Sequence, residues 1–171
     1  MGVTLRGTVL LVAVLAALVS YLWLGERHPR AEATLPALLS ARPADVARIE
    51  LQEGENRLTA VRNGAGWTDE SGRPLRGDTI GDLIEALATL RPVMLVDPAP
   101  ENPADYGLGA GATHLELKAR DGKPLALLEV GERNPAWTGL YARVGGKPEV
   151  VLVGAVLHWE LEKLHDAAPA G

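Results

Sequence analysis

Residues 114–130, HLELKARDGKPLALLEV, decide the fold class of this chain. The first five residues alternate between polar and apolar side chains, and apolar residues dominate again from Leu125 to Val130, as is typical of two β-strands. Asp121-Gly122 lies between them, and Asp-Gly is a strong signal for the tight turn of a β-hairpin. The stretch therefore predicts an antiparallel hairpin.

Similar patterns on both sides extend this prediction. Strands at 46–51 and 57–62 would form one more hairpin, and strands at 140–144 and 149–153 another. A short strand is expected at Trp67-Thr68, and a short buried strand at 93–96.

Two helices complete the predicted domain. Apolar residues at helical spacing indicate a helix from Ile80 to Leu90 and another at about 155–167. We therefore expect an α+β domain over residues 44–168, in which antiparallel hairpins are covered by two helices. The order of the elements suggests two similar ββα half-units, at about 44–96 and 113–167.

The N-terminal residues have a different composition. Residues 7–25, GTVLLVAVLAALVSYLWLG, contain no charge, and a helix of this length spans ~28 Å at ~1.5 Å per residue, close to a bilayer's hydrocarbon core. They predict a transmembrane anchor at 1–25 that contacts the lipid bilayer through 7–25, with Tyr21 and Trp23 at the membrane interface. Residues 26–43, which contain three prolines, would form a stalk.

The same N-terminal segment bears on whether the chain is cleaved and on which side of the membrane its domain lies. Ala31-Glu32-Ala33 resembles a signal-peptidase site, so cleavage is the alternative to a permanent anchor. Basic residues are nearly balanced across the segment, with Arg6 on one side and Arg27 and Arg30 on the other. By analogy with signal anchors, we expect a single-pass protein of the bacterial inner membrane whose domain lies in the periplasm.

Composition excludes several classes of function. The chain has no cysteine, which rules out thiolate catalysis and Cys-ligated metals, and its net charge of -5 does not fit nucleic-acid binding. The glycines at 107, 109 and 111 lead into a strand rather than a helix, so they do not form a dinucleotide loop. We predict no catalytic residue, no cofactor and no metal.

One polar cluster has residue types and spacing that suit a metal site. His158, Glu162 and His165 would share one face of the last helix, where Glu-x-x-His is a known ligand pair. The other helix offers Asp82 and Glu85 but no histidine, which favours a solvated polar face.

The tryptophans are the largest apolar side chains, because the chain has no phenylalanine. Trp137 lies in the polar loop 132–139, where it either packs at the edge of the core or is an exposed anchor for a partner protein. Trp, Tyr and Arg dominate interface hot spots, so Trp137, Tyr141 and Arg143 are the candidate partner contacts.

The whole pattern resembles the domain-of-unknown-function family numbered 4340. The resemblance rests on segments in a particular order: Asp45–Leu51, Gly66-Trp67-Thr68, the helix at 80–90, Tyr106-Gly107-Leu108, Leu128–Gly131, Tyr141-Ala142-Arg143 and Val150–Val153. It implies a bacterial envelope protein, often encoded beside gliding-type ABC-transporter components, and it carries over no catalytic residues.

Two functions are consistent with these observations. We expect a membrane-tethered, non-enzymatic accessory or interaction subunit of a bacterial envelope complex, associated with an ABC transporter, with a membrane protein as partner. The alternative is an envelope ligand-binding or hydrolytic domain whose cleft is bordered by the loops at 97–112 and 131–139, with Asp105 as its candidate acid.

Overall fold

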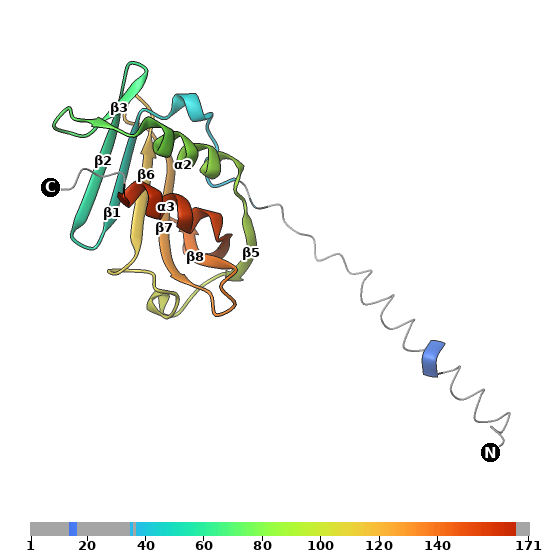
Figure 1. Cartoon of the computed structure of the whole chain (residues 1–171). Helices are drawn as coiled ribbons and strands as arrows, with labels where there is room; N and C mark the ends of the chain where they lie inside the picture. Colours follow the sequence, from blue (N-terminus) through green and yellow to red (C-terminus); the bar gives the residue numbers. More distant parts are fainter. Residues whose placement is uncertain (1–13, 17–34, 36, 167–171) are drawn as a thin grey trace, which may run out of the picture. The chain divides into compact units, whose positions relative to one another are not determined.

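A computed structural model of the chain describes residues 14–16, 35 and 37–166. The chain divides into two units, residues 1–33 and 34–171, which are treated separately. The second unit contains all the strands described below (Figure 1).

The predicted transmembrane helix requires a correction. Among the described residues, no helix is long and apolar enough to cross a membrane. Hydropathy alone supported a helix over 7–25, but of that stretch the structure describes only Val14–Ala16, which are helical and exposed. Tyr21 and Trp23 lie outside the described residues, as do residues 26–34 of the predicted stalk.

The domain is built on one antiparallel sheet of nine strands, in the spatial order β4-β3-β2-β1-β6-β7-β8-β9-β5. In chain order the strands are β1 (Arg48–Glu53), β2 (Asn56–Asn63), β3 (Gly66–Thr68), β4 (Pro74–Leu75), β5 (Pro92–Asp97), β6 (Thr113–Lys118), β7 (Pro124–Arg133), β8 (Gly139–Val144) and β9 (Val150–Gly154).

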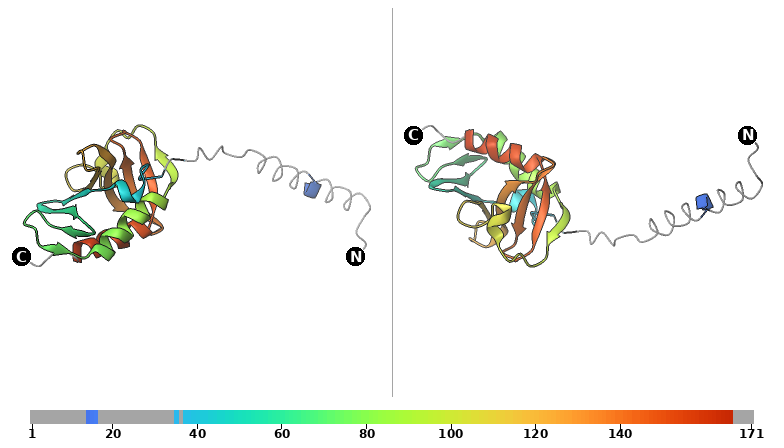
Figure 2. Two further views of the ribbon diagram at one scale, coloured as in Figure 1. Left: turned by 90° about the horizontal axis from the view of Figure 1, so that it is seen from above. Right: turned by 90° about the horizontal axis from the view of Figure 1, so that it is seen from below.

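Two helices cover one face of this sheet. They are α2 (Gly77–Thr89) and α3 (Val156–Asp166), which pack beside each other in every view (Figures 1 and 2). Two short 3-10 turns, η1 (Pro43–Asp45) and η2 (Pro103–Tyr106), lie in the connections before β1 and after β5.

The core lies between the sheet and the helices. Alternate residues of the central strands are buried there, such as Ile49 in β1 and Leu115 in β6, and they meet Leu83 of α2 and Leu157 of α3 in one apolar cluster. Burying one leucine side chain contributes about 1.5–3 kcal/mol, so this shared cluster dominates the stability of the fold.

The residues just before η1 belong to the same core. Leu38 and Leu39 are both buried, and their backbone N–H groups donate hydrogen bonds to the carbonyl oxygens of Leu90 and Leu87, at 3.0 and 2.8 Å. The last residues of the predicted stalk are therefore attached to the C-terminal end of α2.

The three predicted hairpins are confirmed as β1–β2, β6–β7 and β8–β9, but the predicted fold class is wrong in its organisation. The two predicted ββα half-units do not form separate sheets in the described part of the chain, because β1 pairs with β6 and β5 pairs with β9. A single continuous sheet results. The strand predicted to be buried at 93–96 is β5, which ends the sheet and is largely exposed.

Candidate functional site: an arginine between two exposed tryptophans

Trp137 lies in the loop between β7 and β8 and is 70% exposed. Its φ of 61° is in the left-handed region, and among the described residues it is the only non-glycine residue with positive φ. That conformation costs an L-amino acid roughly 1–2 kcal/mol. The fold therefore bears a backbone cost to hold a large apolar side chain in solvent.

Asn134 maintains this loop conformation. Its Oδ1 accepts hydrogen bonds from the backbone N–H groups of Thr138 and Gly139 at 2.9 and 3.1 Å, and its Nδ2 donates to the Thr138 hydroxyl at 3.0 Å. The Trp137 N–H donates to the Asn134 carbonyl at 2.9 Å. The loop is thus ordered before any partner arrives, which lowers the entropy cost of binding.

Arg133, the last residue of β7, connects Trp137 to a second exposed tryptophan. Its guanidinium carbon lies 5.1 Å from the ring centre of Trp137 and 5.6 Å from that of Trp159, which is 56% exposed on α3. Both distances are within the range of cation–π attraction. We call Arg133, Trp137 and Trp159 the tryptophan–arginine cluster.

A groove of about 660 Å³ adjoins this cluster, between α3 and the strands. Arg133 lies on its wall, and so do His158 and Glu162, whose Nε2 and Oε1 atoms are 3.2 Å apart. The remaining lining residues are Leu51, Glu53, Thr113, Val130, Gly131, Leu140 and Leu161. The arrangement offers polar groups at the rim and apolar side chains beneath them.

His158 and Glu162 belong to the polar cluster whose sequence spacing suits a metal site. Within the described part of the chain, no three His, Asp or Glu side chains are grouped so that they could hold a metal ion. The side chain of His165 is not among the described ones.

Tyr141 and Arg143, the other two predicted partner contacts, lie apart from the cluster. They alternate with the core residues Leu140 and Ala142 of β8, so they are directed to the sheet face away from the helices. Arg143 is 3.4 Å from the Glu129 carboxylate. This ion pair connects β8 to β7.

Tyr141 likewise helps to hold the connection between β5 and β6. Its ring packs edge-on against Tyr106 with 5.1 Å between ring centres, and the Tyr106 hydroxyl donates to Asp97 Oδ2 at 2.9 Å. That hydrogen bond raises the pKa of Tyr106 above its usual value. The Gly109 N–H donates to the Glu129 carboxylate at 2.6 Å, which fixes the same connection to β7.

The loops at 97–112 and 131–139 pack directly on one another where they meet. A side chain at Gly131 would collide with the Tyr106 carbonyl oxygen, and one at Gly107 would collide with Glu132. The groove beside the cluster is lined by Gly131 and Arg133 but by no residue of 97–112. Asp105 accepts a hydrogen bond from Asn102 at 2.7 Å within η2 and its N-cap.

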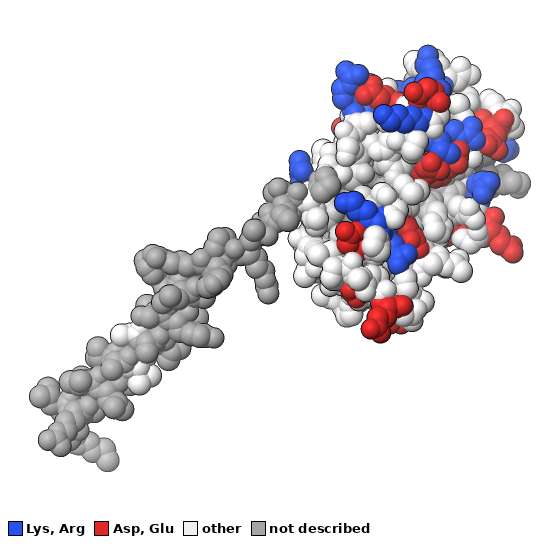
Figure 3. Space-filling model, turned by 180° about the vertical axis from the view of Figure 1, so that it is seen from behind, with Lys and Arg blue, Asp and Glu red and all other residues white. Residues whose placement is uncertain are grey.

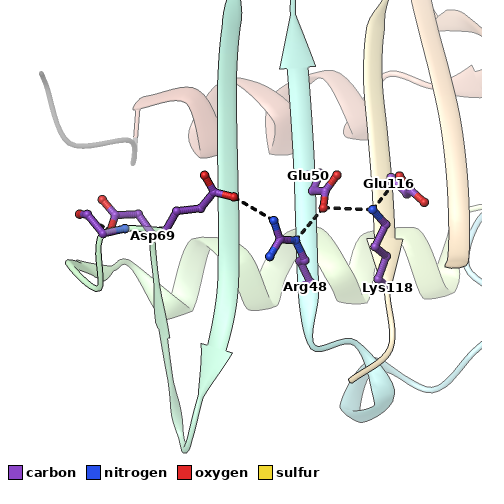
Figure 4. A network of polar contacts seen from close by, with 7 residues as sticks. Arg48, Glu50, Asp69, Glu116 and Lys118 are labelled. Carbon is purple, nitrogen blue, oxygen red and sulfur yellow. Dashed lines mark hydrogen bonds and ion pairs between the residues drawn. The ribbon is translucent and has the colours of Figure 1, made fainter. Parts of the chain in front are cut away.

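The most extensive charged cluster lies elsewhere, on the sheet face away from the helices (Figure 4). Glu50 of β1 is 2.6 Å from Arg48 and 3.0 Å from Lys118, and Lys118 is also 3.1 Å from Glu116. Lys118 and Arg48 lower the pKa of Glu50. In the β1–β6 register Arg48 lies opposite Lys118 and Glu50 lies opposite Glu116, so opposite charges pair diagonally rather than directly across the strands. Glu70 is also 2.8 Å from Arg48. Each of these charges is held in an ion pair, which favours a structural role over the binding of a ligand.

Sequence reasoning missed two members of the tryptophan–arginine cluster. Neither Arg133 nor Trp159 is among the partner contacts predicted from the sequence. A helical signal does indicate that Trp159 is exposed. At ~100° per residue, Trp159 projects about 200° from Leu157, a residue of the apolar stripe of α3, and therefore outward.

The fold defines a protein built on one antiparallel nine-stranded sheet, with α2 and α3 of the described residues on the same face. The chain belongs to the family described as "Domain of unknown function (DUF4340)", whose model matches residues 67–167. The predicted resemblance is thereby confirmed. Comparison with curated proteins and with solved structures gave no match.

Proposed function

We propose that this protein is a non-enzymatic accessory subunit that binds a partner protein through the tryptophan–arginine cluster. The observation that carries the proposal is Trp137, whose side chain is exposed on a strained but firmly hydrogen-bonded loop. Strained backbone persists where the surrounding structure enforces it, and it concentrates at functional sites.

The composition of the cluster supports a protein partner. Trp and Arg are the residues most enriched at interface hot spots, and rigid side chains lose little entropy when they are buried. Trp137 and Trp159 also lie on different elements, which Arg133 bridges. A partner would therefore meet one composite surface.

The wider setting is proposed from family membership and the resemblance stated above. We place the complex in the bacterial envelope and expect a membrane protein, associated with an ABC transporter, as the partner. The contact of residues 7–25 with lipid stays a prediction from the sequence, because those residues lie almost entirely outside the described ones.

Co-purification tests the proposal. The full chain, extracted from its native cells with a mild detergent, is expected to elute with a second polypeptide. Trp137→Ala combined with Trp159→Ala should weaken that complex by at least about 30-fold, since one hot-spot residue contributes ~2 kcal/mol. Val156→Ala is the matched control, because Val156 is 51% exposed on the same helix. Equal recovery of the partner with both variants would contradict the proposal.

The groove favours one alternative function, the binding of a small envelope ligand. Glu162→Gln changes the groove without removing a contact of either tryptophan. His158 is left unchanged, because its ring packs edge-on against Trp159 with 5.3 Å between ring centres. Under the proposed function, Glu162→Gln leaves recovery of the partner unchanged. A ligand that copurifies with the wild-type chain and is lost from this variant would instead support the alternative.

A further inference from the structure

Strand β5 ends the sheet on one side and presents an apolar surface. Val93, Met94 and Leu95 are 65%, 53% and 46% exposed, although they are consecutive residues of one strand. Two β-bulges, between Pro92 and Met94 and between Leu95 and Asp97, break the usual alternation and so explain this run. Large exposed apolar patches commonly mark interaction sites.

A shallow apolar hollow continues this surface. It has a volume of about 450 Å³ and is lined mostly by apolar residues, among them Leu95, Leu35, Leu125 and Leu127, and also by Lys147 and Glu149. Leu127 is itself 41% exposed. In the rear view of Figure 3, the side of the domain where β5 lies is mainly uncharged. The exposed strand and the hollow therefore form one patch, which we call the β5 surface.

The sequence of β5 is complementary to itself. Residues 91–97 read RPVMLVD, so an antiparallel pairing of two copies about Met94 sets Val93 opposite Leu95 and Arg91 opposite Asp97. A two-fold symmetric contact requires such self-complementarity. If residue i of one copy contacts residue j of the other, then residue j of the first copy contacts residue i of the second. Opposite charges facing each other across paired strands also favour that register.

Arg91 and Asp97 are both able to form an ion pair between two copies. Arg91 is exposed and forms no ion pair with the residues that the structure describes. Asp97 accepts hydrogen bonds from the Tyr106 hydroxyl and the Ala99 N–H, at 2.9 Å each. A carboxylate has about four acceptor sites, so Asp97 can still bind a guanidinium.

We infer that the β5 surface is an interface between two copies of this chain, related by a two-fold axis at Met94. This inference is independent of the tryptophan–arginine cluster, which lies on other elements. Pro92 lacks an N–H, and the bulges shorten the regular ladder, so side chains provide most of this contact.

Cysteine crosslinking in the full chain tests the inference, because the chain has no cysteine of its own. Met94→Cys places two thiols at the axis, where paired strands bring Cα atoms to ~4.5–5.5 Å, within disulfide range. Mild oxidation in cells is expected to give a disulfide-linked dimer. Val156→Cys, which has similar exposure on α3, is the control and should stay monomeric.

The pairing register has its own test. In the Met94→Cys background, Arg91→Glu places like charges opposite each other at two symmetric positions and should lower the dimer yield about fivefold. Arg91→Lys keeps the charge and should preserve the yield. Resistance to trypsin shows that each variant is folded.

Three results would overturn the inference. Dimer yield from Met94→Cys could be no higher than from Val156→Cys, the cysteine could crosslink only to a different protein, or Arg91→Glu could leave the yield unchanged. Since the tryptophan–arginine cluster is intact in all these variants, their failure leaves the proposed function standing. Failure of the co-purification test likewise leaves the dimer standing.

Discussion

At Trp137, backbone strain and solvent exposure coincide in one residue. A tryptophan that served the fold would be buried, as Trp67 is, where its ring lies 4.7 Å from the Arg62 guanidinium carbon. The two tryptophans follow equivalent hairpins in the sequence, yet only one of them stabilises the core. This contrast supports the binding role proposed for Trp137.

Trp137→Gly should therefore cost little stability. Glycine relieves the left-handed strain of roughly 1–2 kcal/mol, which offsets the lost cation–π contact with Arg133 and the greater freedom of the unfolded chain. We expect the free energy of unfolding, measured by denaturant titration, to stay within about 1 kcal/mol of wild type while the partner is lost. A loss of more than ~2 kcal/mol would assign Trp137 to the fold instead.

The contribution of Asp69 to the stability of the fold is expected to depend on pH. Hydrogen bonds from the Ser71 hydroxyl and from the Arg73 backbone and side chain lower the pKa of its carboxyl to about 2. A carboxyl with a lowered pKa stabilises the fold above its usual pKa of 3.8, and that contribution is lost as pH falls toward about 2.

Carboxyl titration by NMR checks this prediction. Ser71→Ala removes the largest cause of the shift and should move the pKa of Asp69 back toward 3.8. Ser40→Ala, in an exposed position outside the Asp69 turn, serves as the control and should leave the titration unchanged. A pKa near 3.8 in the wild-type chain would show that the turn is not formed as described.

Among the elements, η2 and β7 are joined by a contact that only glycine permits. A Cβ at Gly131 would collide with the Tyr106 carbonyl oxygen, which is backbone and cannot easily move. Gly131→Ala should destabilise the domain by about 1–3 kcal/mol through overpacking.

A second glycine provides the matched control. Gly81 lies inside α2 with open space around its Cβ position, so Gly81→Ala should stabilise the domain by about 0.5–1 kcal/mol through helix propensity. Thermal unfolding of both variants gives the comparison. If Gly131→Ala left the melting temperature unchanged or raised it, as Gly81→Ala should, the close packing of η2 on β7 would be refuted.

The elements that could be predicted from the sequence are those with local signals. Alternation and turn residues such as Asp121-Gly122 identified three hairpins, and apolar spacing identified α2 and α3. The pairing of β5 with β9 could not be predicted, since it joins Met94 to Leu152 across most of the domain. Burial of 93–96 was mispredicted because a short apolar run fits a central strand and an edge strand equally well.

The candidate site could be predicted only in part, because two of its three residues come together only in the tertiary structure. The loop chemistry around Trp137 marked it as an interface candidate, and its exposure agrees with that interpretation. Arg133 and Trp159 join it through the tertiary fold, which brings the end of β7 beside α3. Tyr141 and Arg143 are near Trp137 in sequence, but strand alternation directs them to the opposite face of the sheet.

At the scale of the whole molecule, the sheet separates three surfaces with different chemistry. The face opposite the helices carries paired charges, the β5 side is apolar, and the end of β7 with α3 carries the tryptophan–arginine cluster. This separation would let one domain bind a second copy and a different protein at the same time.

In-cell photocrosslinking tests the central claim most directly. A photoreactive residue at Ala136, exposed next to Trp137, should give one discrete adduct with a different polypeptide, and Trp137→Gly in the same chain should abolish it. The same residue at Glu55, exposed in the turn between β1 and β2, should give none. Equal adducts at both positions, or an adduct at 136 that persists without Trp137, would contradict the account.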